Sequence, residues 1–166
     1  IQGMMGDDPV YLKTVPCGKH YLANNTEFNR HTGSSDMDDR DMREFYLYPY
    51  RTLIRDYSLP SIMTAYNAVN GVPVSASRFL VDTIARKTYG LDGYITGDCG
   101  AIDDMVRGHA YAKSPEEATA LGLKSGVDTD CGGVYQNHAI AALEKGLLTE
   151  GDIDKALVNM FAIRMR

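Results

Sequence analysis

The hydrophobic and polar positions along the chain follow two alternating patterns. Short runs of β-favouring residues, each bounded by polar or glycine-containing turns, predict strands over residues 14–21, 61–67, 93–97 and 125–131. Between these runs, apolar residues recur at intervals of three and four, which is typical of a helix with one buried face. The order strand, helix, strand, helix predicts parallel strands joined by right-handed crossovers.

The helical spacing predicts helices over residues 38–57, 77–89, 135–145 and 150–165. Pro49 should kink or split the first of them, because proline lacks the backbone N–H that a helix interior needs. Gly90 is a natural left-handed cap for the second. The run Ser114-Pro115-Glu116-Glu117 predicts a further helix that begins with a capping box and has proline at its first position.

Two parallel α/β architectures fit this order of elements. A doubly wound sheet would carry a glycine-rich phosphate loop, and neither GxGxxG nor GxxxxGK[ST] is present. A barrel instead places polar residues at the ends of several strands, and here these are Lys19 and His20, Tyr66 and Asn67, Asp98, and residues 128–131. We therefore expect a partial (β/α)8 TIM-type barrel of about four βα units, with residues 1–166 as a fragment of one domain.

Composition narrows the possible partners. A formal net charge of -5 without a basic stripe, and the lack of any apolar run of about 20 residues, favour neither nucleic acid nor a membrane. The 3 cysteines have no CxxC spacing, so we expect no zinc site, although one disulfide pair is possible. The chain begins at Ile1 and ends within a helical pattern, so we expect an internal piece of a longer protein.

Asp98 is the first candidate for chemistry, because it lies at a predicted strand end between Gly97 and Gly100. A carboxylate in such a turn is open to a ligand, but aspartate also caps helices and closes turns. Lys19 and His20 offer hydrogen-bond donors to sugar hydroxyls or a carbonyl, or simply lie at the surface.

Other polar groups near the strand ends have alternative interpretations. Lys19 could form a Schiff base, as in an aldolase-like barrel. Tyr66 could hydrogen bond a carboxylate and hold it ionised, or be an ordinary aromatic residue at a strand end. Asp103 and Asp104 are interpreted as helix-start charges. The remaining histidines lack metal-ligand spacing, and we expect surface or packing roles for His31, His109 and His138.

Five ordered segments resemble one known family. They read KHYLANNTEFNRH, DMREFYLYPYRTLI, MTAYNAVNGVPVSAS, YGLDGYITGDCGAI and SGVDTDCGG. In this order and spacing they are similar to the second half of the catalytic barrel of glycoside hydrolase family 3, which contains β-glucosidases and β-xylosidases. The similarity runs from about Pro16 to the end of the chain.

The resemblance implies roles for individual residues. Asp98 matches the catalytic nucleophile, although Gly97 stands before it where serine is commoner in the family. Lys19 and His20 match the pair that holds sugar hydroxyls in the cleavage subsite, and Tyr66 matches the tyrosine near the nucleophile. Arg30 and Met63 match recurrent positions, which we also include among the expected substrate-binding residues.

The residue after the nucleophile separates branches of the family. The glucosidase branch usually carries tryptophan there, whereas this chain has Cys99 and no tryptophan at all. GDCGAI and VDTDCGG are similar to the β-xylosidase and α-arabinofuranosidase branch, which implies that Cys99 and Cys131 approach each other and pair as a disulfide. The N-acetylglucosaminidase branch is disfavoured, because its KHFPGHG loop is replaced by KHYLANNTEFNRH.

The resemblance implies a retaining exo-glycosidase that needs no cofactor and no metal and acts on an oligosaccharide or small glycoside. Its acid/base would come from a second domain outside this chain, so the isolated fragment should be inactive. For the parent enzyme we favour β-xylosidase over β-glucosidase activity, and an extracellular or periplasmic location. The alternatives are an aldolase-type barrel using Lys19 and a non-catalytic carbohydrate-binding remnant.

Overall fold

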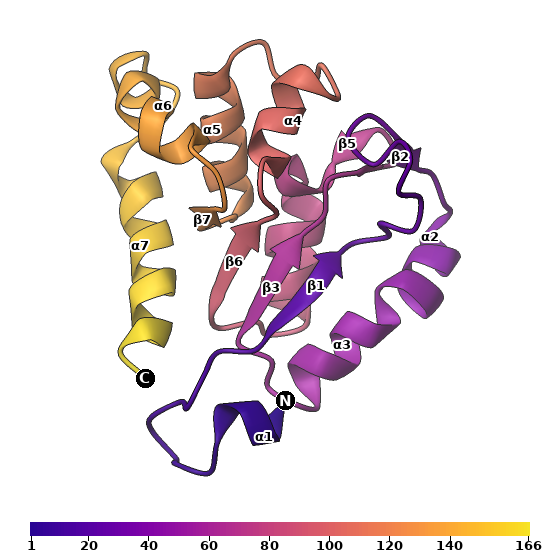
Figure 1. Cartoon of the computed structure of the whole chain (residues 1–166), viewed down its shortest axis with the longest axis vertical. Helices are drawn as coiled ribbons and strands as arrows, with labels where there is room; N and C mark the ends of the chain where they lie inside the picture. Colours follow the sequence, from indigo (N-terminus) through magenta and orange to yellow (C-terminus); the bar gives the residue numbers. More distant parts are fainter.

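A four-stranded parallel sheet forms the centre of the protein. The computed structural model describes residues 1–166, and its strands are β1 (Cys17–Tyr21), β3 (Ser61–Thr64), β6 (Tyr94–Gly97) and β7 (Thr129–Asp130). They lie in the order β1-β3-β6-β7, and every neighbouring pair is parallel (Figure 1). All four predicted strands and their parallel orientation are thereby confirmed.

Helices connect these strands. In chain order they are α1 (Gln2–Met5), α2 (Asp39–Asp41), η1 (Met42–Tyr46), α3 (Tyr48–Arg55), η2 (Val74–Ala76), η3 (Phe79–Thr88), α4 (Ala101–Arg107), α5 (Pro115–Ser125), α6 (Val134–Glu144) and α7 (Glu150–Arg164). Helix α3 packs against β1 and α7 packs against β6, so the helices flank the sheet (Figure 1). No helix has the length and apolar character that crossing a bilayer would require.

The predicted helix over residues 38–57 is split, as Pro49 suggested. It runs as α2, the π-helical segment η1 and α3, with Pro49 in the first turn of α3. The proline is tolerated there because N–H groups in a first turn have no partner within the helix. The second predicted helix ends as expected before Gly90, which has a φ of 86°.

The capping box predicted at Ser114 forms only in part. The Ser114 hydroxyl accepts a hydrogen bond from the Glu117 N–H at 3.3 Å, as expected. The Glu117 carboxylate, however, accepts from the N–H of Lys113 at 2.7 Å instead of reaching back to Ser114. The reciprocal half of the prediction is wrong, because a free donor one residue upstream satisfies the carboxylate.

A second, smaller sheet was not predicted. It contains β2 (Ser34–Ser35), β4 (Ala68–Val69) and β5 (Val72–Pro73) in the order β2-β4-β5, with β4 and β5 antiparallel. Strands of two residues leave no periodicity to detect. The Asn70-Gly71 dipeptide at the turn was the available signal, because both residues have positive φ, as a tight hairpin requires.

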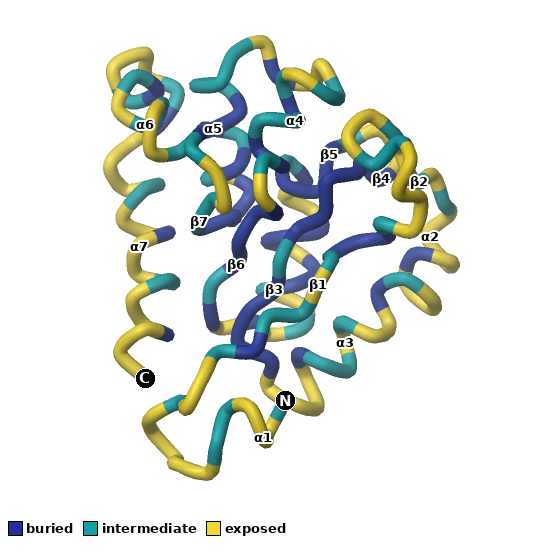
Figure 2. The backbone as a smooth tube through the Cα atoms, viewed as in Figure 1, coloured by how far each residue is buried: buried dark blue, intermediate teal, exposed yellow.

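The core lies between one face of the main sheet and the helices. Ile62 and Ile95 on the central strands are fully buried in one cluster with Leu80 and Ile102. Figure 2 shows buried residues along β3 and β6 and exposed ones along α1 and much of α7. Burying each such side chain is worth roughly 1.5–3 kcal/mol, so this face anchors the sheet.

The opposite face of the sheet is open. Met63 and Tyr94, which alternate with the buried isoleucines, are only partly buried, and Lys19 is exposed. A parallel sheet with helices on one face and side chains on an open second face has the layout of part of a (β/α)8 barrel, whose interior that second face would line. The predicted fold class, a partial TIM-type α/β barrel, is confirmed.

Candidate active site

The carboxyl ends of β1, β3 and β6 meet at one edge of the sheet, and Asp98 follows β6 at that edge. The Asp98 N–H donates to the carbonyl of Thr64 on the neighbouring strand at 3.1 Å. Gly100, with a φ of 89°, then reverses the chain into α4, and its N–H donates to the Cys131 carbonyl at 3.1 Å. The turn that carries Asp98 is therefore fixed from both neighbouring strands.

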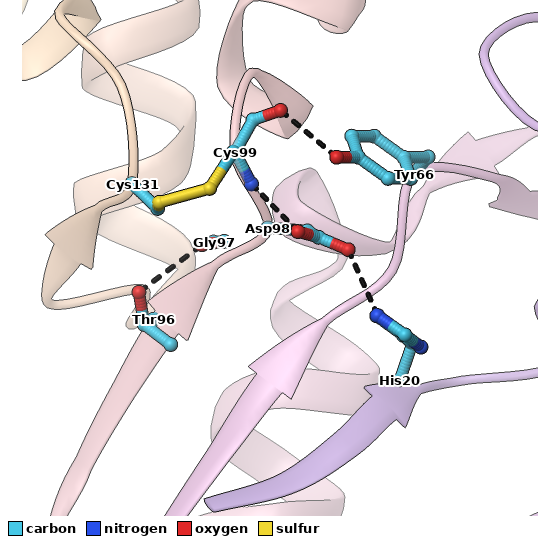
Figure 3. Close-up of a disulfide and its surroundings, with 7 residues drawn as sticks. All are labelled: His20, Tyr66, Thr96, Gly97, Asp98, Cys99 and Cys131. Carbon is cyan, nitrogen blue, oxygen red and sulfur yellow. Dashed lines mark hydrogen bonds and ion pairs between the residues drawn. A yellow bond between two sulfur atoms is a disulfide. The ribbon is translucent and has the colours of Figure 1, made fainter.

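The Asp98 carboxylate has one partner on each oxygen. Its Oδ1 accepts a hydrogen bond from the Cys99 N–H at 2.7 Å, and its Oδ2 lies 3.1 Å from His20 Nε2 (Figure 3). The residue is 8% exposed, so its orientation is set mainly by these two contacts. An ionised carboxylate is a group that can act as a nucleophile.

Tyr66 lies beside this turn and supports it from the side. Its hydroxyl donates to the Cys99 carbonyl at 3.0 Å (Figure 3). The phenol reaches this turn from the end of β3 and also lies close to the Asp98 carboxylate. Burial, together with the nearby Asp98 charge, raises the pKa of Tyr66 and keeps the phenol a donor.

Three further side chains surround Tyr66. The Arg30 guanidinium lies 4.7 Å from the centre of the ring, and the His31 ring centre is 4.6 Å away. His109 Nε2 lies 2.8 Å from the Tyr66 carbonyl oxygen. The structure thus places Arg30 beside Tyr66, and its expected role in substrate binding stays a prediction. It also adds two histidines for which we expected only surface or packing roles.

Lys19 and Met63 are more loosely placed. Lys19 is exposed on β1, and Met63 is half-buried on β3. Neither side chain forms a hydrogen bond or ion pair with Asp98, whereas His20 does. Lys19 and His20 together line a cavity of about 510 Å³, which also contains polar and aromatic residues. Lys19 and His20 therefore border a space between β1 and the η1–α3 segment where a ligand can bind.

A disulfide joins Cys99 to Cys131, which confirms the expected pairing. The sulfur atoms are 2.12 Å apart and the Cα atoms 4.3 Å apart (Figure 3). Cys131 follows β7, so the bridge ties the residue after Asp98 to the next strand end. Cys17 on β1 is a free, half-buried thiol, and burial raises its pKa.

Asp128 does not belong to the site, although the sequence placed it at the fourth strand end. It precedes β7, and its N–H donates to the carbonyl of Ile95. Ile95 lies within β6, before the end of that strand where Asp98 follows. Its buried carboxylate forms an ion pair with Arg86 and accepts from the Ile95 N–H at 2.7 Å and from Asn159 Nδ2 at 2.8 Å. Burial raises the pKa of Asp128. The residue is a structural link, and that prediction was wrong.

Two other polar residues at the strand ends are also structural. Asp130 accepts a hydrogen bond from the Val134 N–H at 3.0 Å and so holds the start of α6. Asn67 is buried and donates to the carbonyls of Leu22 and Ala68 at 3.2 and 2.9 Å. Both side chains therefore form hydrogen bonds to neighbouring backbone groups.

Asp103 and Asp104 lie in the first turn of α4, which confirms their interpretation as helix-start charges. Asp103 pairs with Arg107 on the same helix at 3.1 Å. Asp104 also pairs with His31 at 2.6 Å, and no local sequence pattern indicated this contact because the two residues are 73 positions apart. No group of three or more His, Cys, Asp or Glu side chains is arranged to hold a metal ion.

The site therefore combines a carboxylate at the strand ends of a parallel α/β sheet with a neighbouring imidazole and a nearby phenol. Comparison with known proteins shows the family to which this fold belongs. Residues 1–164 match the Glycosyl hydrolase family 3 N terminal domain. The chain belongs to glycosyl hydrolase family 3.

Two curated relatives are each about two fifths identical to this chain in sequence. A probable exo-1,4-beta-xylosidase of Neosartorya fischeri is 41% identical over 95% of this chain and 21% of the relative. Beta-D-xylosidase 3 of Arabidopsis thaliana is 38% identical over 100% of this chain and 22% of the relative. The chain therefore spans about a fifth of the length of these curated relatives.

Solved structures show the same arrangement. A family 3 exo-beta-xylosidase in complex with a xylobiose aziridine activity-based probe superimposes with a TM-score of 0.92 at 34% identity, over 96% of this chain and 22% of that one. A beta-glucosidase from Listeria innocua gives a TM-score of 0.81 at 27% identity, over 89% and 20%.

Proposed function

We propose that the protein containing this chain is a retaining exo-glycosidase with Asp98 as its nucleophile. It hydrolyses terminal non-reducing β-D-xylosyl residues, and α-L-arabinosyl or β-D-glucosyl residues are its secondary substrates. The observation that carries the proposal is the Asp98 carboxylate, held by the Cys99 N–H and by His20 at the open edge of the sheet.

The reaction follows from this geometry in two steps. A carboxylate oxygen of Asp98 bonds to the anomeric carbon while the bond to the leaving oxygen breaks, and a second carboxyl group protonates that oxygen. Water then attacks the glycosyl-enzyme and returns the carboxylate, with the second group acting as base. The second carboxyl belongs to another domain of the parent protein, and residues 1–166 belong to its barrel domain.

The residues around Asp98 orient the sugar and the nucleophile. His20 holds Oδ2, and Lys19 on the same strand presents an ammonium group to the adjoining cavity, where hydroxyl groups can accept from it. Arg30 offers a second cationic donor from above the Tyr66 ring. Met63 supplies an apolar surface on the open face of β3.

The preference for xylose rests on Cys99. The disulfide fixes this side chain against the strand end of β7, where the glucosidase branch would have a large indole. Relatives named as xylosidases match almost the whole chain. A β-glucosidase is the second candidate, supported by the similarity to solved beta-glucosidases.

Hydrolysis of three 4-nitrophenyl glycosides by the full-length parent tests the proposal. We expect the highest kcat/KM for the β-D-xyloside, followed by the α-L-arabinoside and the β-D-glucoside. Proton NMR should show the β-anomer of xylose as the first product, because retention needs two displacements. An α-anomer as first product contradicts the assigned mechanism, and a preference for glucoside favours the second candidate.

The remaining alternatives predict different observations. An aldolase-type enzyme would give a borohydride-trapped adduct of a carbonyl substrate on Lys19. A carbohydrate-binding remnant would bind xylose but release no nitrophenol. The isolated 166-residue chain should show little activity in any case, because it lacks the proton donor and leaves both sheet edges unpaired.

A further inference from the structure

His31 and Asp104 form a pair beside the Asp98 site, and neither takes part in the proposed reaction steps. His31 lies in the loop after β1 and Asp104 in α4, and His31 Nδ1 is 2.6 Å from Asp104 Oδ2. The Asp104 side chain is 16% exposed and that of His31 49%. A short contact between a largely buried carboxylate and an imidazole is a strong, charge-assisted hydrogen bond.

The second nitrogen of His31 continues the contact. Arg30 Nε donates to His31 Nε2 at 3.3 Å, so the imidazole accepts from Arg30 and donates to Asp104 through Nδ1. Arg30 is also held by Glu27, whose Oε2 lies 2.8 Å from Nη1. Hydrogen bonds therefore run from Asp104 through His31 to the guanidinium of Arg30.

Two members of this chain of bonds, Arg30 and His31, contact Tyr66. The guanidinium of Arg30 and the ring of His31 lie over or against the Tyr66 ring, at 4.7 and 4.6 Å. A cation over an aromatic face is attracted by the electron-rich face of the ring. Since the Tyr66 hydroxyl donates to the Cys99 carbonyl, the contacts reach the turn that carries Asp98.

The backbone also allows the loop after β1 to lie close against the end of α4. A Cβ atom on Gly108, at the end of α4, would collide with the His31 carbonyl oxygen, so only glycine lets the loop approach this closely. His109, the next residue, lies 2.8 Å from the Tyr66 carbonyl through its Nε2. The loop after β1 and the end of α4 thus fit each other closely around Tyr66.

We propose that His31 and Asp104 act as a positioning pair that holds Arg30 and Tyr66 in place at the mouth of the Asp98 site. Neither residue contacts Asp98, so they act through Arg30 and Tyr66. Loss of His31 leaves Asp104 largely buried without its partner and Arg30 without one of its three contacts. The effect on reaction rate rests on the proposed function, whereas the effect on Arg30 geometry does not.

Kinetics of variants of the full-length parent test the proposal. We expect His31→Ala and Asp104→Ala each to lower kcat/KM for the β-D-xyloside about tenfold. The double variant should lose little more than either single variant, because both remove the same contact. Asp104→Asn keeps an oxygen that can accept from His31, so it should recover most of the activity that Asp104→Ala loses.

A matched control comes from the same helix. Arg107→Ala breaks the neighbouring Asp103–Arg107 pair, which is exposed on the arginine side, and should leave kcat/KM within about twofold of wild type. Thermal unfolding of every variant separates a loss of folded protein from a loss of rate. A lower Tm with unchanged kcat/KM, or additive losses in the double variant, overturns the proposal.

Crystal structures of the parent with and without His31→Ala provide a readout that needs no turnover. We expect the Arg30 guanidinium to leave the Tyr66 ring in the variant and to stay there in Arg107→Ala. An unmoved Arg30 and Tyr66 contradict the positioning role even if the parent proves not to be a glycosidase. Absence of turnover in the wild type contradicts only the proposed function.

Discussion

Asp98 and Asp128 are two acids on neighbouring strands with opposite surroundings. Asp98 follows β6, has one partner on each carboxylate oxygen, and lies at the open edge of the sheet. Asp128 precedes β7 and is enclosed by the Arg86 guanidinium, a backbone N–H and the Asn159 amide. The first carboxylate keeps acceptor capacity for a ligand, whereas the second is saturated by the fold.

The difference shows how a carboxylate in a candidate active site can be distinguished from one that only holds the fold together. A buried charge is tolerated when it is paired and fully hydrogen bonded, and it then has nothing left to offer a substrate. Arg86 performs that pairing and also donates to the Gly93 carbonyl at 2.8 Å, so it ties η3 to the sheet. Two aspartates that look alike in the sequence therefore have different roles.

Removing the Asp98 carboxylate should have the largest effect on activity. Asp98→Asn in the parent should lower kcat for the β-D-xyloside by at least about 1000-fold, because the amide cannot form the covalent intermediate. The fold should be kept, since an amide can still contact His20 and the Cys99 N–H. Steady-state kinetics and circular dichroism check both statements, with Asp103→Asn as the control. Near-wild-type turnover would refute the role of Asp98.

Removing the Asp128 carboxylate should instead act on stability. Asp128→Ala leaves the Arg86 charge buried and unpaired, which costs about 3–5 kcal/mol. We expect the Tm to fall by roughly 10 °C, with kcat/KM of the remaining folded enzyme nearly unchanged. A large loss of kcat/KM at unchanged Tm would place Asp128 in the site after all.

The disulfide is expected to contribute to the stability of both regions, with a smaller effect than that of the Asp128 carboxylate. Cys99→Ala combined with Cys131→Ala should destabilise the protein by about 2–4 kcal/mol, because the unfolded chain regains freedom over the intervening loop. A count of free thiols in the denatured, non-reduced 166-residue chain should give one, belonging to Cys17, and three after reduction. Three thiols before reduction contradict the bridge.

The smallest expected effect concerns the ion pair between Glu116 and Lys145. Lys145 holds the pKa of Glu116 at about 2, below the usual 4.5, with Ser114 contributing. A lowered carboxyl pKa stabilises the folded state above pH 4.5, and that stability is lost as the pH falls toward 2. The Tm of Lys145→Met should therefore be slightly below wild type at pH 6, and the two should converge by pH 2. Constant separation across this range contradicts the pairing.

The sequence predicted the sheet well, because each strand is a short apolar run between glycine-containing turns. It also located Asp98, Tyr66 and the cysteine pair, whose surroundings are set within a few residues or implied by the family. The helix boundaries at Pro49 and Gly90 followed from the restricted backbone of those two residues.

The sequence could not predict contacts between distant residues. Arg86 and Asp128 are 42 positions apart, and His31 and Asp104 are 73 apart, so no local pattern links them. The assignment of Asp128 to the strand ends failed because a shift of two residues along β7 moves a side chain from the open edge to the level of Ile95. Such a shift is invisible until the strands are in register.

Trapping the covalent intermediate tests whether Asp98 is the nucleophile. The full-length parent is incubated with 2,4-dinitrophenyl 2-deoxy-2-fluoro-β-D-xyloside, digested, and analysed by mass spectrometry. We expect a covalent 2-fluoroxylosyl group on Asp98 and none on Asp103, Asp104 or Asp128. Labelling of a different carboxylate, or turnover of xyloside substrates with no label on Asp98, would contradict the assignment of Asp98 as the nucleophile.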